Sequence, residues 1–250
     1  MIVRKSPQEI ARMRRAGRIV ATTIEGLLEE VRSGLTTADL DRLAEGSIRE
    51  QGAVPSFMGY RGFPASICAS LNNEVVHGIP GDRVLREGDL LSLDVGAIWE
   101  GYHGDSAVSV FVGEAPSAEA EKLVRVTEES LEAGISQLRP GNRLSDVGHA
   151  IQQVVEGVGF NVVREYVGHG IGQQLHEDPP IHNFGPPGRG PELRPGLVVA
   201  VEPMVNAGDW KTRVLSDGWT VVTEDGSLSA HFEHTIVVTE QGPEVLTARG

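Results

Sequence analysis

The stretch LSLDVGAIWEGYHGDSA (Leu91–Ala107) predicts two β-strands joined by a tight turn. The turn falls at Trp99-Glu100 or Glu100-Gly101, and either choice gives a two-residue loop. A loop of even length places Asp94 and Asp105 on one face of the hairpin, directly opposed in one register and diagonal in the other. Their apolar neighbours put both at the edge of a core, where burying unpaired charges is costly. A divalent cation between them would resolve this conflict, and arginine pairing or solvent exposure is the alternative.

Around this hairpin the sequence predicts pairs of helices separated by strands. Ser6-Pro7-Gln8-Glu9 is a capping box that begins a helix ending at Ser33-Gly34, and Thr37 begins a second helix that Gly52 stops. Further helices are expected at about 117–137 and 144–157, and strands at about 65–70, 90–98, 103–112, 197–205, 219–223 and 230–238. Residues 160–192 are Gly- and His-rich loop and strand. This alternation predicts an α+β fold with an antiparallel sheet backed by helices.

The composition excludes several classes of protein. The 250 residues carry a net charge of −13, which argues against a general nucleic-acid binder. No run of apolar residues is long enough to predict a transmembrane helix, and no apolar run follows the basic N-terminus as in a secretory signal. The single cysteine, Cys68, rules out an internal disulfide framework, so we expect a reducing, cytoplasmic setting.

The basic residues are concentrated near the N-terminus. Residues 1–18 hold six of the 22 basic residues against one acid. A solvated helix face is the simpler interpretation, and a contact surface for an anionic partner such as ribosomal RNA is the other.

Two more carboxylates lie in strand-like segments. Glu202 lies in the apolar run LVVAVEPM and is hard to explain as solvated surface, whereas Glu233 in SLSAHFEHTIVV lies on a face that is polar in any case. Among eight histidines, His169 in YVGHGIG is the best metal-ligand candidate because its glycine neighbours allow close approach. His77 and His176 also lie in loops, beside Gly or Pro.

The charges of these groups balance for a site with two metals. Four carboxylates match two divalent ions, and His169 completes a mixed oxygen and nitrogen set suited to Mn(II), Fe(II), Co(II) or Zn(II). Two such ions roughly 3.5–4 Å apart lower the pKa of a bridging water and polarise a carbonyl. The sequence therefore predicts hydrolytic chemistry.

At these residues the chain closely resembles the bacterial type I methionine aminopeptidases. The segments NNEVVHGIP, GHGIG, LHEDP, VEPM and SLSAHFEHT carry the resemblance, in order, over nearly the whole chain. The resemblance implies the pita-bread fold, with two pseudo-symmetric halves around a central antiparallel sheet. It also implies one catalytic metallopeptidase domain over residues 1–250, with a short helical region, 1–52, packed onto it.

The resemblance assigns roles to particular residues. The implied metal ligands are Asp94, Asp105, His169, Glu202 and Glu233, with Asp105 and Glu233 bridging the two ions. The implied catalytic residues are His77 near the scissile bond and His176 on the substrate carbonyl. Glu202 is the candidate proton shuttle, as base and then acid, and the bridging hydroxide alone is the alternative. The implied walls of an apolar methionine pocket are Tyr60, Phe63, Cys68, Leu175 and Trp219, with Phe57 near, and His77 and His176 also face the substrate. Five residues depart from the best-known enterobacterial pattern: Phe57, Arg61, Phe63, Leu175 and His231. We expect an unchanged preference for methionine with altered inhibitor affinity.

The implied function is removal of the initiator methionine from nascent proteins, preferentially when the second residue is small. The implied partners are nascent polypeptide N-termini, with transient ribosome contact left open, no membrane, and a monomeric state. An X-Pro aminopeptidase or prolidase would share the metals, but the separate N-terminal domain typical of those enzymes is missing. A peptide-binding module without catalysis is the rival from another class, and the complete ligand set argues against it.

Overall fold

The computed structural model describes residues 2–250, so Met1 of the predicted 1–250 domain lies outside the described residues. The helices are α1 (Pro7–Glu30), α2 (Thr37–Glu50), α3 (Ala118–Ser136) and α4 (Leu144–Glu156), with a 3₁₀ turn η1 at Tyr60–Gly62. The strands are β1 (Val54–Pro55), β2 (Ile67–Leu71), β3 (Glu74–Val76), β4 (Leu90–Trp99), β5 (Tyr102–Phe111), β6 (Asn161–Val162), β7 (Gly168–Gly170), β8 (Glu177–Ile181), β9 (Val198–Val201), β10 (Met204–Asn206), β11 (Thr212–Val214), β12 (Val221–Thr223), β13 (Ser229–His231), β14 (His234–Thr239) and β15 (Gly242–Val245).

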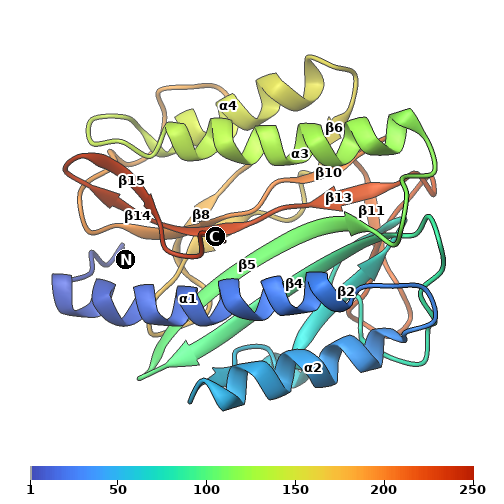
Figure 1. Ribbon diagram of the computed structural model, residues 1–250. Helices are drawn as coiled ribbons and strands as arrows, with labels where there is room; N and C mark the ends of the chain where they lie inside the picture. The colour runs from blue at the N-terminus through green and yellow to red at the C-terminus, as the bar shows by residue number, and fades with distance from the viewer. Residues whose placement is uncertain (1) are drawn as a thin grey trace.

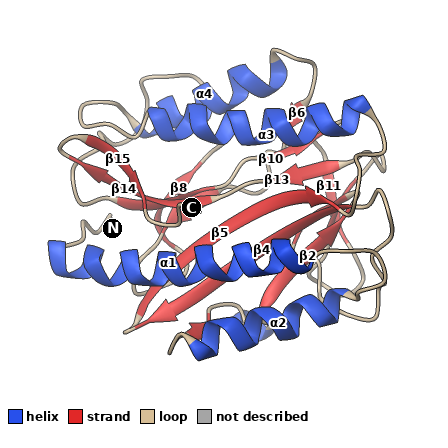
Figure 2. Cartoon of the chain, in the orientation of Figure 1, coloured by secondary structure: helices blue, strands red, loops and turns tan. Residues whose placement is uncertain are grey.

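The strands lie between two pairs of helices (Figures 1 and 2). Helix α1 packs on β4 and β5 with α2 beside it, while α3 and α4 pack together over β13, β10, β6 and β8. The strand orders are β1-β4-β2 with β5 on β4, β13-β10-β6, β11-β12-β3 and β15-β14-β9-β7-β8. All the strand pairs among residues 2–250 are antiparallel, as the sequence predicted. Within the same residues no helix has both the length and the apolar character needed to cross a membrane.

The β4–β5 hairpin has the diagonal one of the two predicted registers. Trp99 pairs with Tyr102, so the turn is Glu100-Gly101. Both turn residues have positive φ, 47° and 79°, which is the backbone that a two-residue hairpin turn of type I′ requires. Because Asp94 pairs with Ala107, Asp105 lies two positions away on the same face.

Helix α1 supports this hairpin from behind. The predicted capping box is present, since the Ser6 amide donates to Glu9 Oε2 at 2.7 Å and the Ser6 side chain accepts from the Glu9 amide. The helix approaches β5 closely at Gly17 and Gly104, where a Cβ on Gly104 would lie 2.7 Å from the Gly17 nitrogen. Successive residues of a strand face opposite sides, so Gly104 faces the helix while Asp105 faces away from it.

Two predicted strands are interrupted at their acidic residues. The strand predicted at 197–205 ends as β9 at Val201 and resumes as β10 at Met204, because Pro203 has no N–H for the ladder. The strand predicted at 230–238 breaks between β13 and β14, and Glu233 instead forms an isolated bridge with Ala107. The predictions of continuous strands were therefore wrong at Glu202 and Glu233.

We expect Gly104→Ala to lower the free energy of unfolding by about 1–3 kcal/mol, because the new methyl group must push α1 away from β5. Urea denaturation followed by circular dichroism measures the change. Gly46→Ala in α2 is the matched control, since a Cβ there meets nothing within 4 Å and should stabilise the helix by up to about 1 kcal/mol. Equal stability of the Gly104 variant and the wild type would contradict the close packing of α1.

Candidate metal centre

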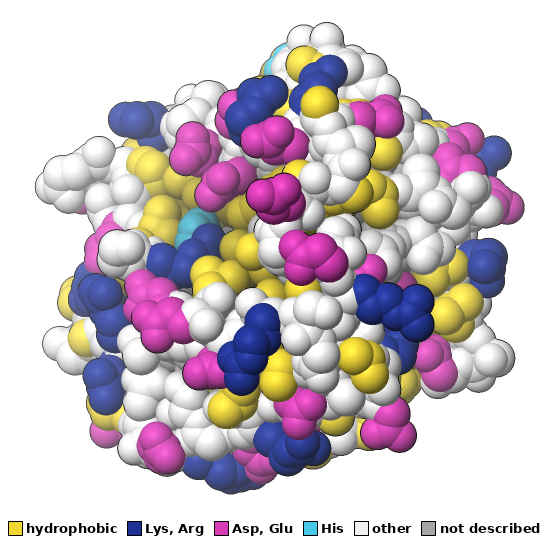
Figure 3. All heavy atoms as spheres, turned by 45° about the vertical axis from the view of Figure 1, so that its right-hand side comes forward, with side chains coloured by type: hydrophobic (Ala, Val, Ile, Leu, Met, Phe, Trp, Pro, Cys, Tyr) yellow, Lys and Arg dark blue, Asp and Glu magenta, His cyan; other side chains and the backbone are white. Residues whose placement is uncertain are grey.

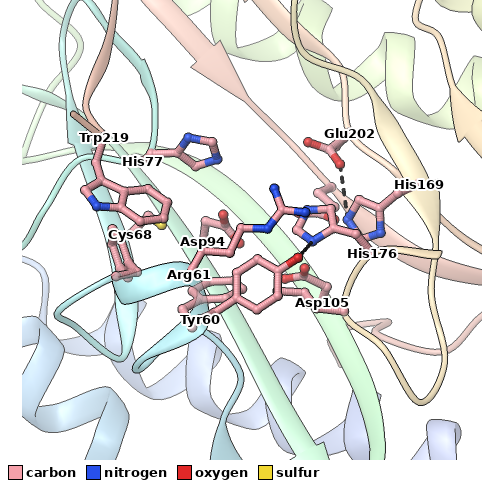
Figure 4. A pocket seen from close by; sticks show the side chains of 14 residues that line it. Tyr60, Arg61, Cys68, His77, Asp94, Asp105, His169, His176, Glu202 and Trp219 are labelled. Atoms are coloured by element: carbon pink, nitrogen blue, oxygen red, sulfur yellow. Dashed lines mark hydrogen bonds and ion pairs between the residues drawn. The ribbon is translucent and has the colours of Figure 1, made fainter. Parts of the chain in front are cut away.

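One cavity collects every residue that the sequence singled out for the site (Figure 4). Its lining residues are Phe57, Tyr60, Arg61, Phe63, Cys68, His77, Asp94, Asp105, His169, Leu175, His176, Glu202, Trp219 and Glu233. Arg61 is the one lining residue that sequence reasoning did not place in the pocket, although it noted the departure from the family pattern there. The flanking glycines of MGYRG were the available signal, since they indicate a tight turn that could present a side chain to the cavity.

The five candidate ligands come from five different segments. Asp94 and Asp105 project from β4 and β5, His169 from β7, Glu202 from the chain after β9, and Glu233 from the chain before β14. One ligand atom each from Asp105, His169 and Glu233, all buried, can be chosen so that the three atoms lie within 4.8 Å of one another. His169 Nε2 lies 3.5 Å from Glu202 Oε1. Asp94 is partly exposed, and it raises the pKa of Asp105 through its charge.

Hydrogen bonds between β5 and the segment around Glu233 hold two of these acids together. The Asp105 amide donates to Thr235 Oγ1 at 3.0 Å, and that hydroxyl donates back to the Asp105 carbonyl at 2.8 Å. Ser106 Oγ donates to the Glu233 carbonyl at 2.6 Å, and the Glu233 amide donates to the Ala107 carbonyl at 3.0 Å. These hydrogen bonds join β5, in the first half of the chain, to the segment around Glu233, in the second half, and so fix the positions of both acids.

His169 presents an unprotonated nitrogen to the acids. Its Nδ1 lies 2.9 Å from the Gly170 carbonyl, which can only accept, so Nδ1 carries the proton. Burial lowers the pKa of His169 to about 3, so the ring is neutral and Nε2 keeps its lone pair. This second-nitrogen hydrogen bond is typical of a metal-binding histidine.

Burial also disfavours the charge on all four carboxyl groups. It raises the pKa of Asp94 to about 7 and raises the pKa values of Asp105, Glu202 and Glu233 well above their ordinary range. Neighbouring negative charges add to the rise for Asp105, Glu202 and Glu233. Asp94 Oδ1, Asp105 Oδ1 and Glu233 Oε1 are buried oxygens with no hydrogen-bond partner among the described residues. Unpartnered carboxylate oxygens around a neutral imidazole nitrogen fit a divalent metal ion.

Two histidines and a tyrosine stand beside these acids. Tyr60 Oη and His176 Nδ1 are 2.8 Å apart and their rings are stacked, while the His176 ring lies 4.2 Å from that of His169. His77 has a positive φ of 61° and packs edge-on against Trp219. Burial, with a smaller effect of the His176 charge, lowers the pKa of His77 to about 4.

The rest of the cavity is an apolar wall. Phe57, Phe63, Cys68 and Leu175 belong to one buried cluster, with Tyr60 and Trp219 packed against it. The rings of Phe63 and Trp219 meet edge to face at 5.1 Å. The cavity therefore has candidate metal ligands on one side and apolar side chains on the other.

A buried ion pair behind His176 was missed from the sequence. Lys5 Nζ lies 2.5 Å from Glu177 Oε2, and the Lys5 side chain is only 4% exposed. The Lys5 amide also donates to the Gly196 carbonyl. The pair ties the segment before α1 to the residue that follows His176, and no local pattern links residues 172 positions apart.

A fold of this kind with a buried carboxylate and histidine centre defines a metallohydrolase, and comparisons with known proteins specify the family. Residues 11–240 match the model of metallopeptidase family M24. Methionine aminopeptidase 1 of Bacillus subtilis is 57% identical over 247 residues, covering 99% of both chains. The crystal structure of methionine aminopeptidase from Thermotoga maritima superposes with a TM-score of 0.98 at 49% identity over 100% of both chains.

The chain belongs to metallopeptidase family M24, and the predicted pita-bread fold is confirmed. A prolidase from Pyrococcus furiosus shares the fold at a TM-score of 0.82 and 20% identity, with 99% of this chain matching 66% of that one.

We expect the metal-free Asp105→Asn variant to be more stable than the metal-free wild type by about 1–3 kcal/mol at neutral pH. An acid whose pKa is raised by folding binds more protons folded than unfolded, so its contribution to stability falls as pH rises through that window. The asparagine cannot ionise, and its advantage should grow from about pH 4 toward pH 7 and above. Urea denaturation in EDTA across this range measures it, and an advantage that shrinks as pH rises would contradict a raised pKa of Asp105 in the folded protein.

With Mn²⁺ the same substitution should act in the opposite direction. Metal at about 100 times Kd stabilises the wild type by about 2.7 kcal/mol, or roughly 5–10 °C in Tm, and the variant should lose most of this gain. Differential scanning calorimetry with and without Mn²⁺ measures both. Asp82→Asn, at an exposed carboxylate outside the cavity, is the control and should keep the wild-type response.

Proposed function

We propose that this chain is a metal-dependent aminopeptidase that removes the N-terminal methionine from polypeptides. The buried group of Asp105, His169 and Glu233 beside an apolar pocket is the observation that carries the proposal. Curated relatives up to 57% identical over nearly the whole chain are named methionine aminopeptidases, which supports it.

Asp94, Asp105, His169, Glu202 and Glu233 would hold two divalent ions, of Co, Mn, Fe(II) or Zn. When bound, such ions supply an activated water and polarise the substrate carbonyl. The carboxylates of the chain then serve to fix the metals, and Glu202, partly exposed to the cavity, also carries a proton from the water to the leaving amine as base and then acid.

His176 and Tyr60 together orient a hydrogen bond toward the substrate. If the Tyr60 hydroxyl donates to His176 Nδ1, the ring carries its proton on Nε2, which donates to the scissile carbonyl as negative charge develops there. Burial lowers the pKa of His176, with a further contribution from the Arg61 charge, and both effects favour the neutral ring. His77 lies near the scissile bond, held against Trp219.

The apolar wall would receive the methionine side chain. Sulfur–aromatic contacts with Phe63 or Trp219 favour a thioether by at most about 1.5 kcal/mol, so the shape of the pocket does most of the selection. We further propose a preference for a small second residue. The rings of Tyr60, His77 and His176 line the same cavity, and they would crowd a large side chain placed after the scissile bond.

We propose nascent polypeptides in the cytoplasm as substrates and a monomer as the working state. On α1, Arg12 pairs with Glu100 and Arg14 with Glu244, so these side chains are engaged within the chain. Acidic and basic side chains are also interspersed over the face in Figure 3. These pairings favour the solvated-face interpretation of the basic N-terminal region over a ribosome contact.

Metal-loaded enzyme should hydrolyse Met-Gly-Met-Met and release free methionine, whereas Ala-Pro peptides should be left intact. Liquid chromatography of the products, with EDTA-treated enzyme as the blank, measures this. Cleavage of X-Pro peptides alone would favour a prolidase, and binding of both peptides without cleavage by metal-loaded enzyme would favour a non-catalytic module.

The hydrogen bond from His176 can be tested within the same assay. His176→Ala should lower kcat by about 10²–10³-fold, the effect of removing one donor to a developing oxyanion. Tyr60→Phe should lower kcat less, and both variants should keep the Tm response to Mn²⁺. His182→Ala, at an exposed histidine outside the cavity, is the control. Wild-type kcat in His176→Ala would rule out the assigned role.

A further inference from the structure

Arg61 lines the cavity, and its charge faces an aromatic ring rather than an acidic side chain. Its side chain is exposed, and its guanidinium carbon lies 5.4 Å from the centre of the Tyr60 ring. Figure 4 shows Arg61, Tyr60 and His176 next to one another at the cavity. Among residues 2–250 no carboxylate forms an ion pair with Arg61, and no other arginine or lysine lines the cavity.

The backbone holds Arg61 in an uncommon conformation. Its φ is 49°, in the left-handed region that an arginine rarely adopts, and Gly59 and Gly62 on either side have φ of 81° and 89°. Of the four non-glycine residues with positive φ between residues 2 and 250, Arg61 and His77 line the cavity, while Glu100 belongs to the hairpin turn. Backbone strain of this kind persists where the surrounding structure fixes it, often at functional sites.

The position of Arg61 indicates which part of a substrate it meets. In the proposed function the methionine side chain would lie against the apolar wall and the scissile carbonyl at His176, so the residues that follow would leave through the mouth. Arg61 is close enough to His176 to lower its pKa through its charge. A guanidinium there is a donor for a carboxylate on the departing chain.

We propose that Arg61 is a specificity-determining residue that favours substrates with an acidic side chain at the third position, after methionine and a small second residue. The inference rests on the proposed aminopeptidase function. The preference runs against the net charge of −13, which by itself would repel acidic peptides. The sign of the preference therefore separates a local contact at Arg61 from the field of the whole protein.

The test compares kcat/KM for Met-Ala-Asp-Ser and Met-Ala-Asn-Ser with Mn²⁺-loaded enzyme. The wild type should favour the aspartate peptide by about three- to fivefold, the size expected of an exposed ion pair, with the gain in KM and lost at high salt. Arg61→Gln should bring the ratio to one or below, Arg61→Lys should retain part of it, and Arg61→Glu should invert it. Arg15→Gln removes the same charge from an exposed residue of α1 outside the cavity and should keep the wild-type ratio.

A wild-type ratio at or below one overturns the inference, as does a preference that survives in Arg61→Gln. If Arg61→Gln fails to fold, the wild-type ratio, its salt dependence and Arg61→Lys still decide. Failure of the wild type to release methionine from either peptide would instead overturn the proposed function, so the two failures are distinguishable.

Discussion

Burial of four carboxyl groups in one cavity, with repulsion between neighbouring charges as a smaller effect, is the constraint on which the site depends. Asp94, Asp105, Glu202 and Glu233 line one cavity, and folding raises the pKa of each. Such a cluster disperses unless the chain confines it. Confinement comes from a hairpin whose register is fixed along ten paired positions and from α1, which touches β5 at glycines and leaves the strand no room to retreat. The stability of the hairpin offsets the cost of the site.

The remaining acids are placed by interruptions in regular structure. The β9 ladder ends at Val201, just before Glu202 and Pro203, and Glu233 precedes β14 and forms a bridge with Ala107. In a continuous strand, the side chains of Glu202 and Glu233 would follow the alternation between the two faces of the sheet. The interruptions release them from this alternation, and both side chains line the cavity. Hydrogen bonds through Thr235 and Ser106 then join the interrupted segment to β5, so that the irregular part of the chain is as well held as the regular part.

Features of the fold and the site that depend on neighbouring residues could be predicted from the sequence, whereas features that depend on contacts between distant residues could not. The alternation of a strand is local and rigid, so the common face of Asp94 and Asp105 follows from the sequence once the loop length is even. The capping box at Ser6 is equally local. Pro203 was an available signal for the break beside Glu202, whereas the break at Glu233 could not be predicted because no proline or glycine marks it. Contacts such as Lys5 with Glu177, or Tyr60 with His176, join residues more than a hundred positions apart and leave no periodic signal.

Burial lowers the pKa of the histidine ligand and raises the pKa of the acidic ligands. This difference determines how protons compete with a metal for the site. Burial lowers the pKa of His169 to about 3, so the imidazole is already neutral and gives up no proton when it becomes a ligand. It raises the pKa values of the four acids, so each must release a proton that the folded, metal-free protein retains more strongly than a free carboxylate would. Protons therefore oppose metal binding through the acids alone. A cation that enters the cavity replaces those protons, and relief of the carboxylate repulsion becomes part of its binding free energy.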